Sequence, residues 1–136
     1  MASEYRGLLY AANADVEAIG ALAAAGVATH TESIGYHAQQ AAEKMVKAAF
    51  EVRDSDYPFT HNIRLLLMRA QEKELLGEPS DEVVEAALYL TGLISVTRYA
   101  EAPDFQEGEA RRAVECANRI AAFLRENGFD AIEIKI

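Results

Sequence analysis

The chain has 136 residues, 22 acidic and 13 basic, with a formal net charge of −9 at pH 7. This length suits one domain with a core of its own, and the composition, 51% hydrophobic and 26% charged, is globular rather than disordered. The acidic balance argues against general nucleic-acid binding, which needs clustered Lys and Arg. However, 11 of the 13 basic residues fall in residues 37–73 and 98–125, which are close to neutral and can accommodate an anionic ligand.

Apolar residues recur with helical spacing in five segments along the chain. The first runs from residue 4 to about 25, with Gly26 as its C-cap. The second runs from about 32 to 52, with Thr31 as a plausible N-cap. Both are long enough to cross a small domain.

The next three helices are separated by short polar breaks. Thr60 is expected to cap the third helix, which stops before Gly77. Ser80 is expected to cap the fourth. A capping box of Asp104 and Glu107 is expected to start the fifth. The Asn127-Gly128 pair is expected to end it.

The last residues follow a different pattern. Ile132, Ile134 and Ile136 alternate with charged residues, as in a strand. A single strand cannot stand alone, so this tail either packs on the helices or pairs with another chain. The predicted fold is therefore a single all-α domain over residues 1–136: an antiparallel up-and-down bundle of about five helices with a short extended C-terminal tail.

The compartment is inferred from cysteine usage and hydropathy. The single cysteine, Cys116, cannot form an internal disulfide. The N-terminal residues lack the basic-then-apolar order of a signal peptide, and the apolar stretch at 19–28 is too short to span a bilayer. We expect a cytoplasmic protein with no membrane partner.

Local signatures of common catalytic and metal sites are missing from the sequence. No His is preceded at three residues by Glu, as di-iron bundles require, and one cysteine does not make a zinc site. Cys116 lies at the edge of an apolar stripe, where a packed, inert thiol is favoured over a nucleophile. We therefore predict no catalytic residues, metal or cofactor. A non-enzymatic protein is favoured over an enzyme.

One polar stripe stands out on the second helix. His37, Gln40, Lys44 and Lys47 fall within about 80° of one another on the helical wheel. His61 is expected at the start of the third helix, where free backbone N–H groups and the helix dipole favour an anion. Together these groups are candidates for holding a phosphate.

The alternative is that the stripe is solvated helix surface. In that case Glu43 and Lys47 form an i,i+4 ion pair, and His61 is a first-turn residue bonded to a neighbouring helix.

Three motifs resemble those of the HEPN domain, the higher eukaryotes and prokaryotes nucleotide-binding domain. Their order and spacing match over roughly residues 4–127, and the first is the most specific. The motifs are Tyr36-His37-Ala38-Gln39-Gln40-Ala41-Ala42-Glu43-Lys44 with Lys47-Ala48, then Thr60-His61 with Leu65 and Leu66, and finally Arg98-Tyr99.

The resemblance implies a compact bundle that commonly forms a homodimer. HEPN domains often work with a minimal nucleotidyltransferase partner, and many belong to toxin–antitoxin or other stress and defence systems. Some are nucleotide- or RNA-associated modules. By this similarity the candidates for a shared polar surface are His37, Gln40, Lys44, His61, Arg98 and Tyr99.

Two departures from the family pattern affect the expected activity. Ala100 stands where the family usually has a proline after Arg-Tyr. Ribonuclease members of the family carry an Arg and a His separated by four to six residues, but no His follows Arg98. Arg53 and His61 have seven residues between them and lie in another segment. The usual endonuclease motif is therefore missing.

Three functions remain open on these grounds. The first is a HEPN accessory protein that binds a nucleotide or RNA, or engages a nucleotidyltransferase. The second is a structural, dimeric helical interaction module. The third is an unconventional ribonuclease that uses His37, His61 and Arg98.

Overall fold

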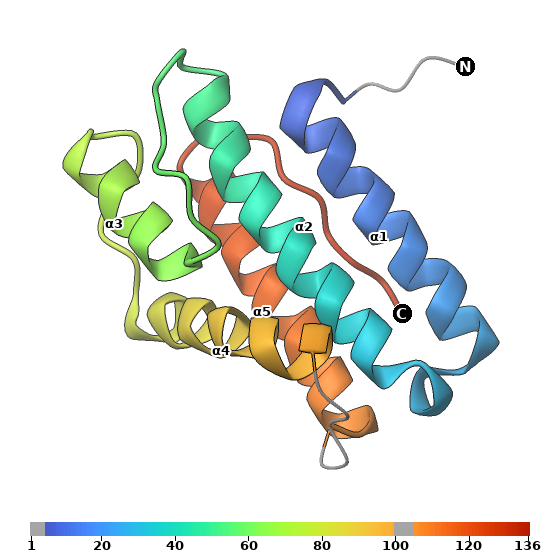
Figure 1. Cartoon of the computed structure of the whole chain (residues 1–136). Coiled ribbons are helices and arrows are strands. Elements are labelled where there is room, and N and C mark those ends of the chain that lie inside the picture. Colours follow the sequence, from blue (N-terminus) through green and yellow to red (C-terminus); the bar gives the residue numbers. More distant parts are fainter. Residues whose placement is uncertain (1–4, 100–104) are drawn as a thin grey trace.

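The structure is a computed structural model that describes the backbone at residues 5–99 and 105–136 and the side chains at 5–94 and 105–136. Within these ranges the regular elements are all helical, which confirms the predicted all-α bundle (Figure 1). The elements are α1 (Gly7–Gly26), the short 3₁₀ helix η1 (Val27–Thr29), α2 (Thr31–Glu51), α3 (Ile63–Glu72), α4 (Asp81–Tyr99) and α5 (Glu107–Glu126).

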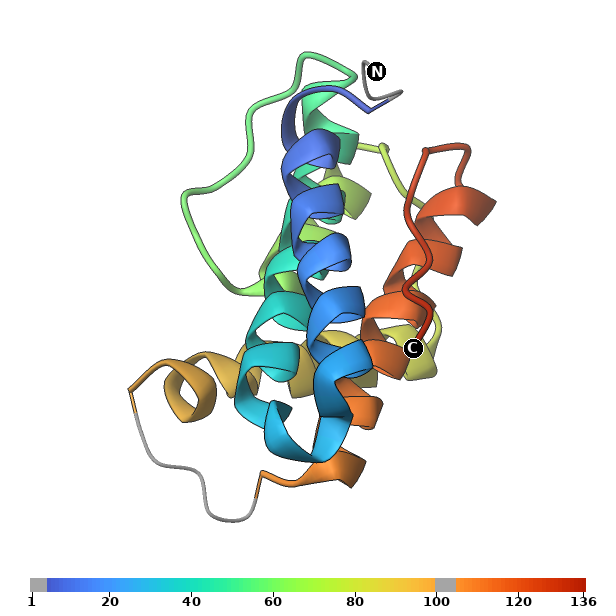
Figure 2. The same cartoon turned by 90° about the vertical axis from the view of Figure 1, so that its right-hand side faces the viewer.

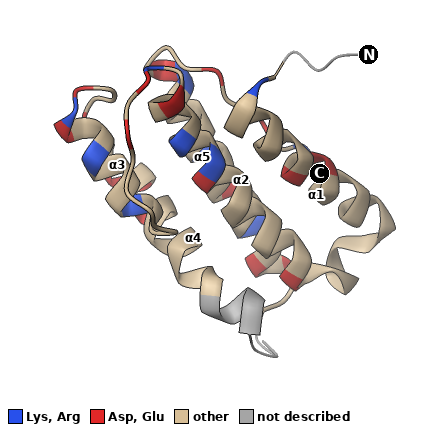
Figure 3. Cartoon of the chain, turned by 45° about the horizontal axis from the view of Figure 1, so that its top comes forward, with Lys and Arg blue, Asp and Glu red and all other residues tan. Residues whose placement is uncertain are grey.

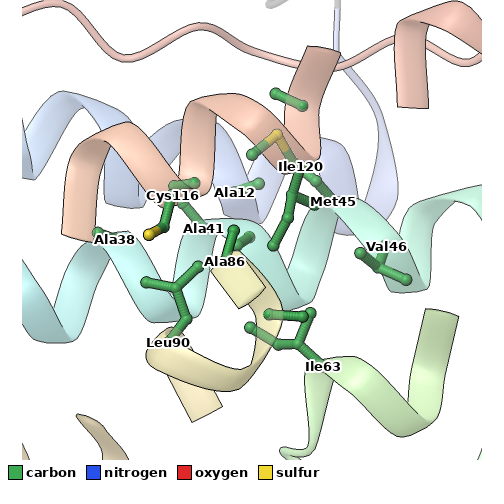
Figure 4. Close-up of a cluster of buried hydrophobic side chains, with 14 of the residues drawn as sticks. Ala12, Ala38, Ala41, Met45, Val46, Ile63, Ala86, Leu90, Cys116 and Ile120 are labelled. Carbon is green, nitrogen blue, oxygen red and sulfur yellow. The ribbon is translucent and has the colours of Figure 1, made fainter. Parts of the chain in front are cut away.

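Helix α2 is the centre of the bundle and contacts every other helix. It runs antiparallel to α1, whereas α5 runs in the same direction as α2 (Figures 1 and 2). Helix α4 crosses the lower part of the bundle in Figure 1, where it passes in front of α5. Small residues on α2, including Ala38 and Ala41, allow these neighbours to approach closely around Met45 and Ile120 (Figure 4).

The starts of α3 and α5 are among those that differ from the sequence prediction. Helix α3 begins at Ile63, not after Thr60, because the Asn62 side chain accepts the Leu65 N–H at 3.0 Å. Helix α5 begins with a capping box formed by Gln106 and Glu109. The Asp104 of the predicted box lies outside the described residues.

The predicted start of α4 and end of α5 are confirmed, whereas α3 ends at Glu72, before the predicted stop at Gly77, and the N-cap of α2 is His30 rather than Thr31. The Ser80 hydroxyl accepts the Val83 N–H at 3.3 Å at the start of α4. Asn127 is the C-cap of α5, and Gly128 follows it with a positive φ of 86°. Helix α1 starts at Gly7, later than predicted, and Glu51 at the end of α2 accepts the Leu8 N–H at 3.0 Å.

By length and composition alone, Gly7–Thr29 is long and apolar enough to cross a membrane, with a mean hydropathy of 1.2 and 17% of that window buried. This is weak evidence for a membrane span, because core helices of bundles pass the same test. In this structure α1 packs on α2 through Leu9, Ala12 and Ile19, which are buried.

The C-terminal tail packs on the bundle rather than standing apart. It runs back along α5 (Figures 1 and 2), and Phe129, Ile132 and Ile134 are buried. The Asn118 side-chain amide makes the two backbone hydrogen bonds at Ile134 that a neighbouring strand would otherwise make. Its Oδ1 accepts the Ile134 N–H at 2.7 Å, and its Nδ2 donates to the Ile134 carbonyl at 2.9 Å. The alternating pattern therefore reflects one face on the helices and one in solvent.

We predict that Asn118→Ala lowers the free energy of unfolding by about 1–3 kcal/mol, because two hydrogen bonds to a buried segment are lost. Urea denaturation measures this change. The matched control is Asn13→Ala on α1, whose side chain bonds only Glu17 at an exposed position, with an expected change below about 0.5 kcal/mol. Equal effects of the two substitutions would contradict the anchoring role of Asn118.

Candidate functional site

The polar stripe of α2 divides between two neighbouring carboxylates. His37 and Lys44 reach Asp15 on α1, whereas Lys47 reaches Glu43 on α2 itself. Basic and acidic positions are accordingly interleaved along this helix (Figure 3). We call the two groups together the polar cluster: Asp15, His37, Gln39, Gln40, Glu43, Lys44, Lys47 and His61.

Asp15 is a buried carboxylate that the sequence prediction missed. It is 7% exposed, yet one oxygen lies 2.8 Å from His37 Nδ1 and the other 2.7 Å from Lys44 Nζ. Charge-assisted hydrogen bonds of this length offset much of the cost of burying the charge. The pair of contacts fixes His37 and Lys44 against α1.

Glu43 is the second buried carboxylate, at 4% exposed. It accepts from Lys47 Nζ at 2.9 Å and from Gln39 Nε2 at 3.0 Å, and it lies 3.0 Å from His61 Nδ1. The expected Glu43–Lys47 ion pair is therefore present. The expectation that this pair lies on solvated surface is wrong, because the loop that carries His61 reaches Glu43.

Gln40 extends the Glu43 half of the cluster. Its Nε2 donates to Gln39 Oε1 at 2.7 Å, and Gln39 in turn donates to Glu43. Across the described residues, no buried side-chain nitrogen or oxygen lacks a hydrogen-bond partner. A connected network of this kind holds its members in one arrangement.

His61 does not occupy the first turn of α3, as the sequence prediction had it, because the Asn62 cap starts that helix two residues later. The helix start is not an open anion site either. The Ile63 N–H donates to Thr91 Oγ1 and the Leu65 N–H donates to Asn62 Oδ1. His61 instead reaches the cluster as a neighbour of Glu43, with its side chain 53% exposed.

The charges of the cluster nearly cancel. Lys44 and Lys47 are matched by Asp15 and Glu43, so the positive charge beyond this balance comes from His37 and His61 when they are protonated. Each histidine uses Nδ1 on its carboxylate, which leaves Nε2 as the ring nitrogen for a ligand. The cluster can therefore offer imidazole and ammonium groups to a phosphate, or an oriented imidazole for proton transfer.

Two predicted site residues, Arg98 and Tyr99, end α4, and their side chains lie outside those that the structure describes. The other five predicted residues, His37, Gln40, Lys44, Lys47 and His61, are brought together through Asp15 or the Gln39–Glu43 network. Within the described ranges, no group of three or more His, Cys, Asp or Glu is placed to hold a metal ion.

Cys116 is packed in the core on α5, 5% exposed, as its position on the apolar stripe indicates (Figure 4). Burial raises the pKa of its thiol, and the nearby Arg112 and Arg119 guanidinium groups oppose this only in part. A raised pKa means less thiolate at a given pH, so the group is a poor nucleophile.

We predict that Ellman's reagent modifies native Cys116 at least about a hundredfold more slowly than the unfolded chain at pH 8, since access requires opening of the core. Release of the thiolate chromophore with and without urea measures the two rates. A native rate equal to that of the unfolded chain would mean that the thiol is exposed.

We predict that Asp15→Asn lowers the free energy of unfolding by about 2 kcal/mol or more, because Lys44 and His37 lose their ionic partner at a buried position. Thermal or urea denaturation measures the loss. Glu17→Gln on the same helix is the matched control, because Glu17 is exposed, and we expect a change below about 0.5 kcal/mol. A neutral Asp15→Asn would refute a structural role for the pairing.

The comparisons with known proteins agree with this architecture. The chain matches the family model of the HEPN domain over residues 5–127. Among solved structures it is similar to the crystal structure of ST0689, an archaeal HEPN homologue, with a TM-score of 0.65 and 23% sequence identity. That match covers 88% of this chain and 93% of the archaeal one, and at this identity it supports the fold. No curated protein matches. From the family match over nearly its whole length, the chain belongs to the HEPN domain family.

Proposed function

We propose that the chain is a HEPN accessory protein that binds a nucleotide or an RNA at the polar cluster and works with a minimal nucleotidyltransferase partner in a toxin–antitoxin or other stress and defence system. The observation that carries the proposal is the pair of histidines, His37 and His61, each held through Nδ1 by a buried carboxylate beside a lysine. The proposed setting is the cytoplasm, without a membrane partner.

Phosphate is the chemical group that fits this arrangement. An approaching phosphate can accept hydrogen bonds from protonated imidazole and from Lys44 or Lys47, which are 28% and 12% exposed. Because Asp15 and Glu43 already balance these lysines, the ligand must compete with internal ion pairs. The cluster therefore suits one small phosphate-bearing group rather than a long nucleic-acid backbone.

A protein partner is supported by an apolar side chain next to the cluster. Phe59 is 102% exposed in the loop before α3, two residues from His61. Large aromatic side chains are enriched among the residues that dominate protein interfaces.

The same chain is expected to form a homodimer. The outer face of α1 is a candidate for the dimer interface, because much of this apolar helix is not buried in the monomer.

An unconventional ribonuclease is the second candidate. A carboxylate on Nδ1 fixes the orientation of an imidazole, which is the arrangement a general base requires. The Arg-x4-6-His motif of ribonuclease members is missing, so the accessory role is preferred. Cleavage of labelled RNA that is lost in both His37→Ala and His61→Ala would reverse this preference.

We predict that isothermal titration with ATP, GTP and a short RNA finds at least one ligand with a Kd of about 1 mM or tighter. Lys44→Gln should weaken this binding about tenfold, because a charge-assisted hydrogen bond is lost while the amide can still bond Asp15. Raising the ionic strength should weaken it as well.

The control is Lys135→Gln, which removes the same charge from an exposed position on the tail and should leave the affinity within about twofold. A pull-down from the native host, read by mass spectrometry, tests the nucleotidyltransferase partner. If the chain binds none of the three ligands and retains no nucleotidyltransferase, the accessory role is wrong, and sedimentation then tests the purely structural dimer.

A further inference from the structure

A cavity of about 350 Å³ lies at the other end of α2 from its Thr31 start, where the beginning of α1, the end of α2 and the turn after α5 meet. These three segments come together at the top of Figures 1 and 2. The volume is within the range of small-molecule sites. None of the residues of the polar cluster lines this cavity, whose wall is formed by Tyr5, Arg6, Leu9, Ala48, Ala49, Glu51, Val52, Arg53, Gly128, Phe129 and Asp130.

The floor of the cavity is apolar and built from small residues. Leu9, Ala48 and Ala49 are all buried, and the two alanines leave open space that larger side chains would fill. Tyr5 and Val52 extend this apolar lining. A ligand that fills the cavity therefore needs an apolar body.

The cationic side of the cavity is set by Arg53 and Arg6. The Arg53 guanidinium lies over the Phe129 ring, 5.0 Å from its centroid, and Phe129 is itself buried. Stacking fixes the plane of a guanidinium and leaves its edge N–H groups for a planar acceptor. Arg53 forms no ion pair with a carboxylate of the described residues.

The two carboxylates of the lining do not cancel this preference. Glu51 accepts the Leu8 N–H, and its carboxylate is packed so closely against Gly7 that an added Cβ there would lie 2.1 Å from Oε1. Glu51 is therefore part of the cavity wall, and its carboxylate accepts a backbone N–H in the first turn of α1. Asp130 is exposed to solvent, and among the described residues it forms no ion pair with Arg53.

We propose that this cavity binds a small organic carboxylate with an apolar body, its carboxylate on the Arg53 guanidinium and its body against Leu9, Ala48 and Ala49. Arginine is suited to this group because its planar N–H fork matches both carboxylate oxygens. The cavity shares no residue with the polar cluster. The proposal can therefore be tested independently of nucleotide or RNA binding.

The test is titration of the full chain with 3-phenylpropionate and with its neutral amide, followed by ¹H–¹⁵N NMR. We expect the acid to bind with a Kd of about 1 mM or tighter and the amide at least about tenfold more weakly. The shifted amide signals should include Leu9, Ala49 and Gly128, which line the cavity from α1, α2 and the turn after α5.

Arg53→Gln should weaken binding of the acid about tenfold, because the charged fork is lost from an exposed residue whose replacement spares the core. Arg64→Gln, at an exposed position on α3, is the matched control and should not change it. Equal affinity for acid and amide, binding unaffected by Arg53→Gln, or no shifts at the three cavity residues would overturn the proposal.

Discussion

The burial of α2 on nearly every side is the constraint on which the rest of the structure depends. Along this helix only Ser33, Tyr36 and Glu51 are exposed. Its polar side chains therefore cannot simply point into solvent, and each needs a partner close by. Asp15 from α1 and Glu43 from α2 itself supply these partners, so the same contacts that hold α1 and the loop before α3 against α2 also build the polar cluster.

This constraint also shapes what the cluster can do. A surface stripe of lysines would attract any polyanion, whereas lysines balanced by buried carboxylates favour a ligand small enough to reach individual donors. The net charge of −9 therefore argues against a polyanion and is compatible with the small phosphate group that we propose.

Local signals in the sequence predicted the parts of the fold that local chemistry determines. Ser80 caps α4 as expected, because its hydroxyl needs only an N–H three residues away.

Asp15 could not be predicted as a site residue, since it stands within an apolar stripe and its partners lie on another helix. The start of α3 was misplaced for a related reason: Thr60 and Asn62 are both good caps, and only the packed loop decides between them. The motif residues of α2 were found by their spacing, but the burial of Glu43 depends on His61 and on tertiary contacts that spacing does not record.

Buried carboxylates hold His37 and His61 through Nδ1, and in the function that we propose the Nε2 atoms face the ligand. Long-range ¹H–¹⁵N NMR of the histidine side chains, recorded while ATP is added, tests this arrangement most directly because it reads the proton on each ring nitrogen. We expect Nδ1 to carry the proton in the neutral rings of both residues and the Nε2 signals to move on titration. Neutral rings protonated at Nε2, or Nε2 signals that do not respond to the nucleotide, would contradict the account.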